Sequence, residues 1–372
     1  MSNITKKKLE QLKFMVLELE KYLKENFAPS HLFLYLDELK QKISEKPFGL
    51  VFEEYLEPTE NIDAKLVEQC KLRIGNNKKI NQLIEGENLH VLKILKQNYN
   101  GGIDVICIDP PYNTGMNWLN YDDHTYLEKE DSYTHSKWLS FIKKRLDIAY
   151  ELLTETGVIF ININENEIGN LLLLCYMIFG ENNVDVLIWP KTDPRFDRNR
   201  VEKSFHNIKI THEYVIVCFK NKNHTNFNKI KLPFFINNQW IESYVEMETI
   251  LKGLGTTSSA KDEIAEIFGN RNFFQTPKPM KLIKEFVRAA SKPDSIILDF
   301  FAGSGTTGHA VMDLNKEDNG NRLFILVNNN ERNICREITY ERLKWAIDKE
   351  TYFESLKYYK LVSDSLFFSL KK

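Results

Sequence analysis

The segment CIDPPYNTG at residues 107–115 places a carboxylate, two prolines and an aromatic ring directly after an apolar run. Two successive prolines cannot continue a strand or a helix, and Pro111 both fixes φ and removes a backbone donor. The Asp109 carboxylate and the Pro110 carbonyl can each accept a hydrogen bond from an exocyclic amine, while the ring of Tyr112 offers a face for stacking against a planar base. Two such acceptors favour an amine nitrogen that becomes tetrahedral and positively charged.

A second segment with the composition of a ligand site, IILDFFAGSGTTG, occupies residues 296–308. An apolar strand there runs into a glycine-rich turn and then a helix, so that backbone N–H groups can approach a ligand closely. Gly303, Gly305 and Gly308 satisfy the GxGxxG pattern, which makes an NAD-dependent oxidoreductase a competing interpretation. Asp299 stands before the glycines, where a carboxylate suits a cationic amine better than a pyrophosphate.

The two segments share one position in the predicted fold, because each follows a buried strand at its carboxyl end. Ligands of open α/β sheets lie at that edge, so Asp109 and Gly303 are expected to face one crevice. Glu331, just beyond the next strand, could accept hydrogen bonds from both hydroxyls of a ribose. The pattern therefore predicts direct methylation of a base amino group held beside a sulfonium methyl, whose carrier is bound by Asp299 and Glu331. Such a transfer needs no metal.

Taken together, the segments resemble the amino-directed, S-adenosylmethionine-dependent DNA methyltransferases. DPPY at 109–112 resembles their catalytic motif and DFFAGSGTTG at 299–308 their cofactor loop, in the order of the circularly permuted β class. Further segments that resemble motifs of this family lie at 83–89, 138–167, 212–214 and 276–279. Phrases such as IDPPYNTG and FFAGSGTTGHAV are similar to modification subunits of type III restriction–modification systems, although the inserted module here is smaller.

This resemblance implies a cofactor, a target and a set of site residues. The cofactor would be S-adenosylmethionine, and the target the N6 amino group of an adenine flipped out of duplex DNA. Catalysis would fall to Asp109, Pro110, Pro111 and Tyr112. The residues implied to contact the cofactor are Glu87, Asn88, Asp109, Lys278, Asp299, Phe301, Ala302, Gly303, Ser304, Gly305, Thr306 and Glu331.

Alternating apolar runs and helical periods predict an α/β protein with a mostly parallel sheet covered by helices on both faces. The predicted strands are 103–108, 158–163, 184–189, 213–219, 295–300 and 322–327. The predicted helices include 5–26, 31–44, 136–153, 168–179, 277–290, 306–314 and 338–349. Residues 116–134 are expected to form a loop, and the resemblance implies that residues 116–133 close over the cofactor and the base.

The chain divides into five expected parts. They are a helical segment at 1–60 that could mediate dimerisation, a catalytic half at 80–220, an inserted target-recognition module at 221–272, a cofactor-binding half at 273–350 and a tail at 351–372. The resemblance implies a fold of the Rossmann-like methyltransferase type for the two halves.

Charge is nearly balanced overall, with a net charge of −2, which is a mild objection to a nucleic-acid partner. Residues 190–232, however, carry ten Lys or Arg against four Asp or Glu. The basic residues expected to contact DNA are Lys191, Arg195, Arg198, Arg200 and Lys203. Duplex DNA, a second copy of the chain and a restriction subunit are the expected partners.

The five cysteines are scattered, without a CxxC pair. This pattern argues against a disulfide framework and a zinc site and suits a reducing cytoplasm. Because the longest apolar run is far too short to span a bilayer, no membrane partner is expected.

Four other functions remain open on the residues alone. Methylation of cytosine N4, methylation of RNA or a protein amide, a catalytically silent DNA-recognition subunit, and the oxidoreductase above all remain compatible with parts of the pattern.

Overall fold

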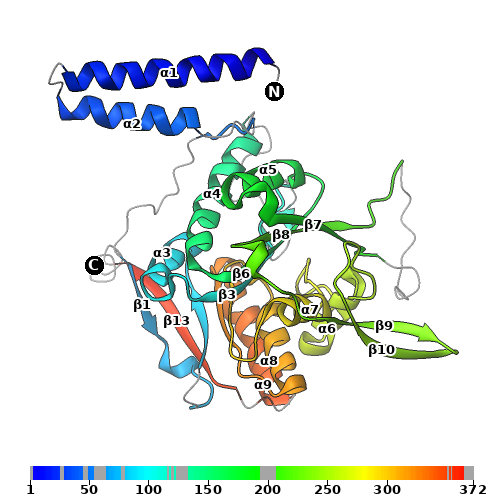
Figure 1. Ribbon diagram of the computed structural model, residues 1–372. Coiled ribbons are helices and arrows are strands. Elements are labelled where there is room, and N and C mark those ends of the chain that lie inside the picture. Colours follow the sequence, from blue (N-terminus) through cyan, green and yellow to red (C-terminus); the bar gives the residue numbers. More distant parts are fainter. Residues whose placement is uncertain are drawn as a thin grey trace. The chain divides into compact units, whose positions relative to one another are not determined.

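The computed structural model (Figure 1) describes residues 3–25, 29–44, 49–53, 64–76, 80–114, 117–118, 121–122, 133–192, 207–349, 352 and 354–363. The chain forms two compact units, Met1–Leu50 and Val51–Lys372. The smaller unit is a helical hairpin of α1 (Asn3–Glu25) and α2 (Ser30–Ser44). Val16 and Leu36 are buried within it, and Lys40 on α2 pairs with Glu20 on α1 at 2.7 Å.

The larger unit is built on a nine-stranded sheet. Its order is β1 (Ala64–Glu68), β13 (Leu356–Ser363), β2 (Asn81–Glu85), β12 (Leu323–Asn328), β11 (Ile296–Asp299), β3 (Ile103–Ile108), β6 (Leu153–Ile163), β8 (Glu213–Phe219) and β7 (Val184–Trp189). The six strands from β13 to β6 run parallel to one another, whereas β1 and β8 are antiparallel to their neighbours. The predicted mostly parallel sheet is therefore confirmed.

Helices lie on both faces of this sheet (Figure 1). One group, in which α4 packs against both others, is α3 (Asn88–Tyr99), α4 (Thr134–Leu152) and α5 (Ile168–Phe179). The other, joined through α8, is α7 (Met280–Ala290), α8 (Thr306–Asp318) and α9 (Glu341–Lys349). Because both faces are covered, central strands such as β3 and β12 are mostly apolar. Phe160 on β6 and Phe286 on α7, for example, stack with ring centroids 4.6 Å apart.

The expected inserted module contains a ribbon and a helix. Strands β9 (Ile230–Ile236) and β10 (Gln239–Val245) form a two-stranded antiparallel ribbon that projects from the larger unit (Figure 1). Its turn places Asn237 and Asn238 at positive φ, which asparagine tolerates better than most residues. Helix α6 (Thr257–Phe268) follows and begins with a capping box between Thr256 and Ser259.

Several elements differ from the sequence prediction. The expected tail contains β13, whose buried Leu356 and Tyr358 place it inside the sheet between β1 and β2. The Tyr358 hydroxyl donates to Glu85 at 2.5 Å. Within the expected loop 116–134, β4 (Asn117–Trp118) pairs with β5 (Tyr121–Asp122), and most of the remainder lies outside the described residues. Helix α4 ends and β6 begins near Leu153, because the chain turns there directly into the sheet.

Short turns complete the structure. They are 3-10 turns at Cys70–Leu72, Glu181–Asn183, Lys222–His224 and Glu331–Asn333, and a π-helical segment at Ile334–Tyr340 that leads into α9. Among the described residues, no helix has both the length and the apolar character needed to cross a bilayer.

Candidate functional site

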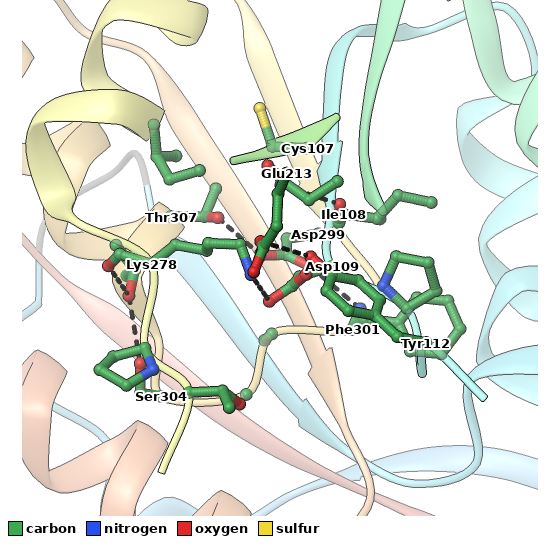
Figure 2. Close-up of a pocket in the computed structure, with 18 of the residues that line it drawn as sticks. Cys107, Ile108, Asp109, Tyr112, Glu213, Lys278, Asp299, Phe301, Ser304 and Thr307 are labelled. Carbon is green, nitrogen blue, oxygen red and sulfur yellow. Dashed lines mark hydrogen bonds and ion pairs between the residues drawn. The ribbon is translucent and has the colours of Figure 1, made fainter. Parts of the chain in front are cut away.

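Strands β3 and β11 are neighbours in the sheet, with Ile106 opposite Leu298. The segments that follow them therefore meet at one edge, as the sequence predicted, although about 190 residues separate them. Between them lies a cavity of about 230 Å³, shown in Figure 2. The predicted residues that line it are Asp109, Pro110, Tyr112, Lys191, Lys278, Asp299, Phe301, Ala302, Gly303, Ser304 and Thr306.

The DPPY segment is held rigidly at the end of β3. The indole Nε1 of Trp138 on α4 donates to the Pro111 carbonyl at 2.8 Å. The Tyr112 hydroxyl lies 2.6 Å from Asp109 Oδ1 and 3.1 Å from Glu213 Oε2. On its other oxygen, Asp109 accepts from Lys278 Nζ at 2.7 Å. Both carboxylate oxygens of the motif are thus already hydrogen-bonded by the chain itself.

The charged groups around Asp109 have opposing effects on the pKa of its carboxyl group. Burial raises the pKa of the Asp109 carboxyl, and the Lys278 ammonium lowers it while Glu213 raises it, with a net increase. Burial also disfavours ionised Glu213, but Lys278 and Lys191 outweigh it and hold its pKa below the usual value. The pKa of Lys278 is raised, because Asp109 and Glu213 more than offset the desolvation of its ammonium.

Asp299 ends β11 and points into the glycine-rich turn. Its Oδ1 accepts from the Phe301 backbone N–H at 3.0 Å, and its Oδ2 accepts from the Thr307 hydroxyl at 2.6 Å. Burial raises the pKa of Asp299 to about 7, although these two donors lower it. The carboxyl is therefore close to half-ionised at neutral pH, and a cation placed beside it would draw it into the ionised form.

The glycine-rich turn after Asp299 is held by side chains from the end of β12 and from the π-helical segment that precedes α9. Gly303 and Gly305 adopt positive φ of 47° and 79°. The Gly303 carbonyl accepts from Thr339 Oγ1 at 2.7 Å and from Asn328 Nδ2 at 3.2 Å. A side chain at Gly305 would approach the Thr339 carbonyl to 3.3 Å. The backbone is thus held in a shape that opens toward the cavity.

Four of the predicted cofactor contacts, Glu87, Asn88, Gly305 and Glu331, are absent from the cavity lining. Arg145 binds Glu87 Oε1 and Asn88 Oδ1, each at 2.6 Å. Asn88 Nδ2 in turn donates to the Phe300 carbonyl at 2.8 Å, so this pair braces the turn from behind. Glu331 is exposed at the start of the turn that follows β12. Their part in cofactor binding stays a prediction, as does the part of Pro111 in catalysis.

The structure adds residues that the sequence left without a role. The sequence places Glu213 only within the segment 212–214 ahead of a strand, yet its carboxylate faces the DPPY segment. Asn162 lies at the end of β6 and donates to the Ile108 carbonyl at 3.2 Å. Its Oδ1 is buried and has no hydrogen-bond partner within the described ranges. The sequence predicts a strand at 158–163, and the pattern of that strand gives Asn162 no role apart from its neighbours.

Of the five basic residues expected at DNA, only Lys191 can be placed. Its Nζ lies 3.3 Å from Glu213 Oε1, at the cavity wall. The other four, Arg195, Arg198, Arg200 and Lys203, lie outside the described residues.

The fold and the cavity place this chain among α/β proteins with a mostly parallel sheet and a ligand-sized cavity at the carboxyl ends of its strands. Within that class, the chain belongs to the DNA methylase family, whose family model matches residues 103–345.

Individual relatives agree with this assignment. The type III restriction–modification enzyme StyLTI Mod subunit of Salmonella typhimurium is 32% identical over 353 residues, which cover 68% of this chain and 52% of that protein. The type II methyltransferase M.KpnI of Klebsiella pneumoniae is 26% identical, over 74% of this chain and 89% of that one. The chain spans between 52% and 65% of the lengths of three type III Mod subunits that it resembles.

Solved structures with a similar fold are more distant. The M1.HpyAVI–SAM complex is 19% identical, covers 71% of this chain and 98% of that one, and has a TM-score of 0.41. PvuII DNA methyltransferase (cytosine-N4-specific) is 15% identical, covers 75% of this chain and 95% of that one, and has a TM-score of 0.46.

Proposed function

We propose that this chain transfers a methyl group from S-adenosylmethionine to the N6 amino group of adenine in duplex DNA. The observation that carries this proposal is the meeting of Asp109 and Asp299 at one cavity, at the ends of adjacent parallel strands. One carboxylate suits an amino group that donates hydrogen bonds, and the other suits a cationic carrier. Membership of the DNA methylase family supports the same reaction.

The cavity residues fit this cofactor. Asp299 offers a buried carboxylate whose charge an ammonium group would stabilise. Phe301, Ala302 and Gly303 supply an apolar ring and a backbone that allows close approach. When bound, S-adenosylmethionine supplies an electrophilic sulfonium methyl group.

The chain's own residues would then prepare the amine. The Asp109 carboxylate and the Pro110 carbonyl accept its two hydrogens, and the Tyr112 ring can stack against the base. S-adenosylmethionine would supply the methyl carbon to this nitrogen, with its sulfur leaving and keeping the electron pair of the carbon–sulfur bond. The nitrogen would become cationic and afterwards release one proton to solvent, and the two acceptors would stabilise this developing charge. Because the cavity is recessed, the base must leave the duplex to enter it.

Adenine is preferred to cytosine because the DPPY form of the motif accompanies adenine in the family that this chain resembles. Methylation of cytosine N4 is the second candidate, since both amines present the same hydrogens to Asp109. A recognition subunit without catalysis is the third.

The partners we propose are duplex DNA, a second copy of the chain and a restriction subunit, within the cytoplasm. The basic stretch 190–232 and the module 221–272 would hold DNA through phosphate contacts and a few base contacts.

The hairpin of α1 and α2 would mediate dimerisation, because it exposes a set of large apolar side chains. These are Phe14, Met15, Leu17, Leu19, Tyr22, Leu32, Leu34 and Tyr35. If a chain lacking residues 1–45 remained a dimer by light scattering, this role would be wrong.

The test of the reaction is transfer of labelled methyl from S-adenosylmethionine to unmodified duplex DNA, followed by nucleoside analysis. We expect N6-methyladenine with the wild type and none with Asp109→Ala. A matched control is Asp185→Ala, because this carboxylate lies on β7 and pairs with Lys222 outside the cavity; it should leave transfer intact. N4-methylcytosine would keep the mechanism and change the target. Cofactor binding without transfer to any DNA would favour the recognition subunit.

A further inference from the structure

Lys278 occupies an unusual position for a lysine. It precedes α7 and is only 8% exposed, and its ammonium ends inside the catalytic cavity instead of in solvent. Its Nζ lies 2.7 Å from Asp109 Oδ2 and 3.5 Å from Glu213 Oε2. Two aromatic rings also face it, with Nζ 5.1 Å from the Tyr112 ring centroid and 5.9 Å from that of Trp189. Both distances lie within the range of cation–π attraction.

Glu213 connects these groups from the opposite side. Its carboxylate is 12% exposed and lies at the first residue of β8. One oxygen faces both Lys278 and the Tyr112 hydroxyl, while the other faces Lys191 at 3.3 Å. The two lysines and two carboxylates balance in charge, so the cluster can remain ionised although it is largely removed from water.

The protonation state of Asp109 decides whether it can act on an amine. An ionised carboxylate only accepts hydrogen bonds, whereas a protonated one donates from one oxygen and loses an acceptor site. Burial at the end of β3 favours the protonated form. A group that keeps Asp109 ionised is therefore needed for the proposed reaction at neutral pH.

We propose that Lys278 and Glu213 are a positioning pair for Asp109, in which Lys278 keeps the carboxylate ionised and Glu213 holds Lys278 in place. This inference rests on the proposed function, and it gives Lys278 a role at the catalytic carboxylate. The charged and titratable groups that face Asp109 come from five segments. They are Tyr112 on its own loop, Lys278 before α7, Glu213 on β8, Asp299 on β11 and Lys191 after β7 through Glu213.

Removing either member of the pair should shift the titration midpoint of Asp109, and the two shifts should have opposite signs. In Lys278→Met the adjacent positive charge is lost, so the titration midpoint of Asp109 should rise by about 1–3 pH units. In Glu213→Gln a negative charge is lost while an amide can still accept from Tyr112, so the midpoint should fall by about one unit. Lys278→Arg keeps the charge and should restore most of the wild-type midpoint. A merely structural role would not give shifts of opposite sign.

The midpoint can be measured directly, without methyl transfer, by carbon NMR of protein labelled at aspartate carboxyl carbons. The Asp109 signal is assigned by its absence in Asp109→Asn. The matched control is Lys284→Met, because this lysine on α7 pairs with Asp313 and Glu317 away from the cavity and should leave the midpoint unchanged. Equal midpoints in all variants, or shifts of the same sign in Lys278→Met and Glu213→Gln, would overturn the proposal.

A second readout links the pair to catalysis. With cofactor and unmodified plasmid DNA both saturating, the acid limb of kcat should move upward in Lys278→Met and downward in Glu213→Gln. If the midpoints shift as expected but the wild type transfers no methyl group at any pH, the proposed function fails while the positioning pair stands. If kcat is high in wild type and its acid limb does not follow the measured midpoints, the pair does not serve catalysis.

Discussion

The ionisation of Asp299 should make the affinity for S-adenosylmethionine depend on pH. The folded chain holds this carboxyl at a pKa of about 7, against a usual value of 3.8, because it is buried at the end of β11. If the cofactor's ammonium group binds the ionised carboxylate, binding at lower pH must first remove the proton. Each unit below the pKa then costs about 1.4 kcal/mol of binding free energy.

The magnitude follows from the fraction that is ionised. Asp299 is half-ionised at pH 7 and about 1% ionised at pH 5, so the dissociation constant should be roughly 50-fold larger at pH 5 than at pH 7. The cofactor's own amino group, with an α-amino pKa near 8, stays protonated over this range. At pH 6, binding should release about 0.9 proton per site.

Isothermal titration calorimetry at pH 5, 6 and 7, in buffers of different ionisation enthalpy, measures both the affinity and the released proton. Asp299→Asn should bind more weakly at pH 7 and lose most of the pH dependence. Asp313→Asn is the matched control, because Asp313 on α8 pairs with Lys284 outside the cavity and should behave as the wild type. Affinity that is constant between pH 5 and 7, or an unchanged slope in Asp299→Asn, would refute the reasoning.

The same carboxyl should affect stability. Between about pH 4 and 7 the folded state keeps a proton on Asp299 that the unfolded chain has released. Because the folded state then binds more protons, the free energy of unfolding should fall as pH rises through this window. Urea denaturation of the wild type and Asp299→Asn checks this, and a flatter pH profile is expected for the variant.

Three further predictions concern packing. In Gly308→Ala the new Cβ would meet Leu343 Cδ2 at 2.7 Å in the core, so urea denaturation should show a loss of about 1–3 kcal/mol; an unchanged midpoint would mean that the core yields freely. Arg145→Met removes a buried guanidinium from Glu87. We expect the free energy of unfolding in urea to fall by about 3 kcal/mol. A decrease below about 1 kcal/mol would contradict this expectation. Truncation before residue 351 deletes β13, which leaves β1 without a sheet neighbour and β2 paired with β12 alone, so it should abolish cooperative thermal unfolding by circular dichroism. A truncated chain that melts like the full one would show that β13 is dispensable.

Local sequence was enough to locate the central strands and the two site segments. Runs such as Ile103–Ile108 are apolar except for Asp104 because both sheet faces are covered, and prolines or glycines end them. The same rules failed for β13, in which Leu356 and Tyr358 are buried but Lys357 and Lys360 interrupt the apolar residues. Its place between β1 and β2 depends on pairing with residues almost 300 positions away.

The sequence by itself determined the chemistry at each strand end, because the types and spacing of residues such as Asp109 and Asp299 are local properties. Only the tertiary structure decided which groups surround them. Glu213 and Lys278 reach Asp109 from β8 and from the start of α7, and no local periodicity specifies where those side chains point. Strand order and side-chain direction arise from packing across the whole sheet, and in this protein that packing brings the Lys278 ammonium to the Asp109 carboxylate.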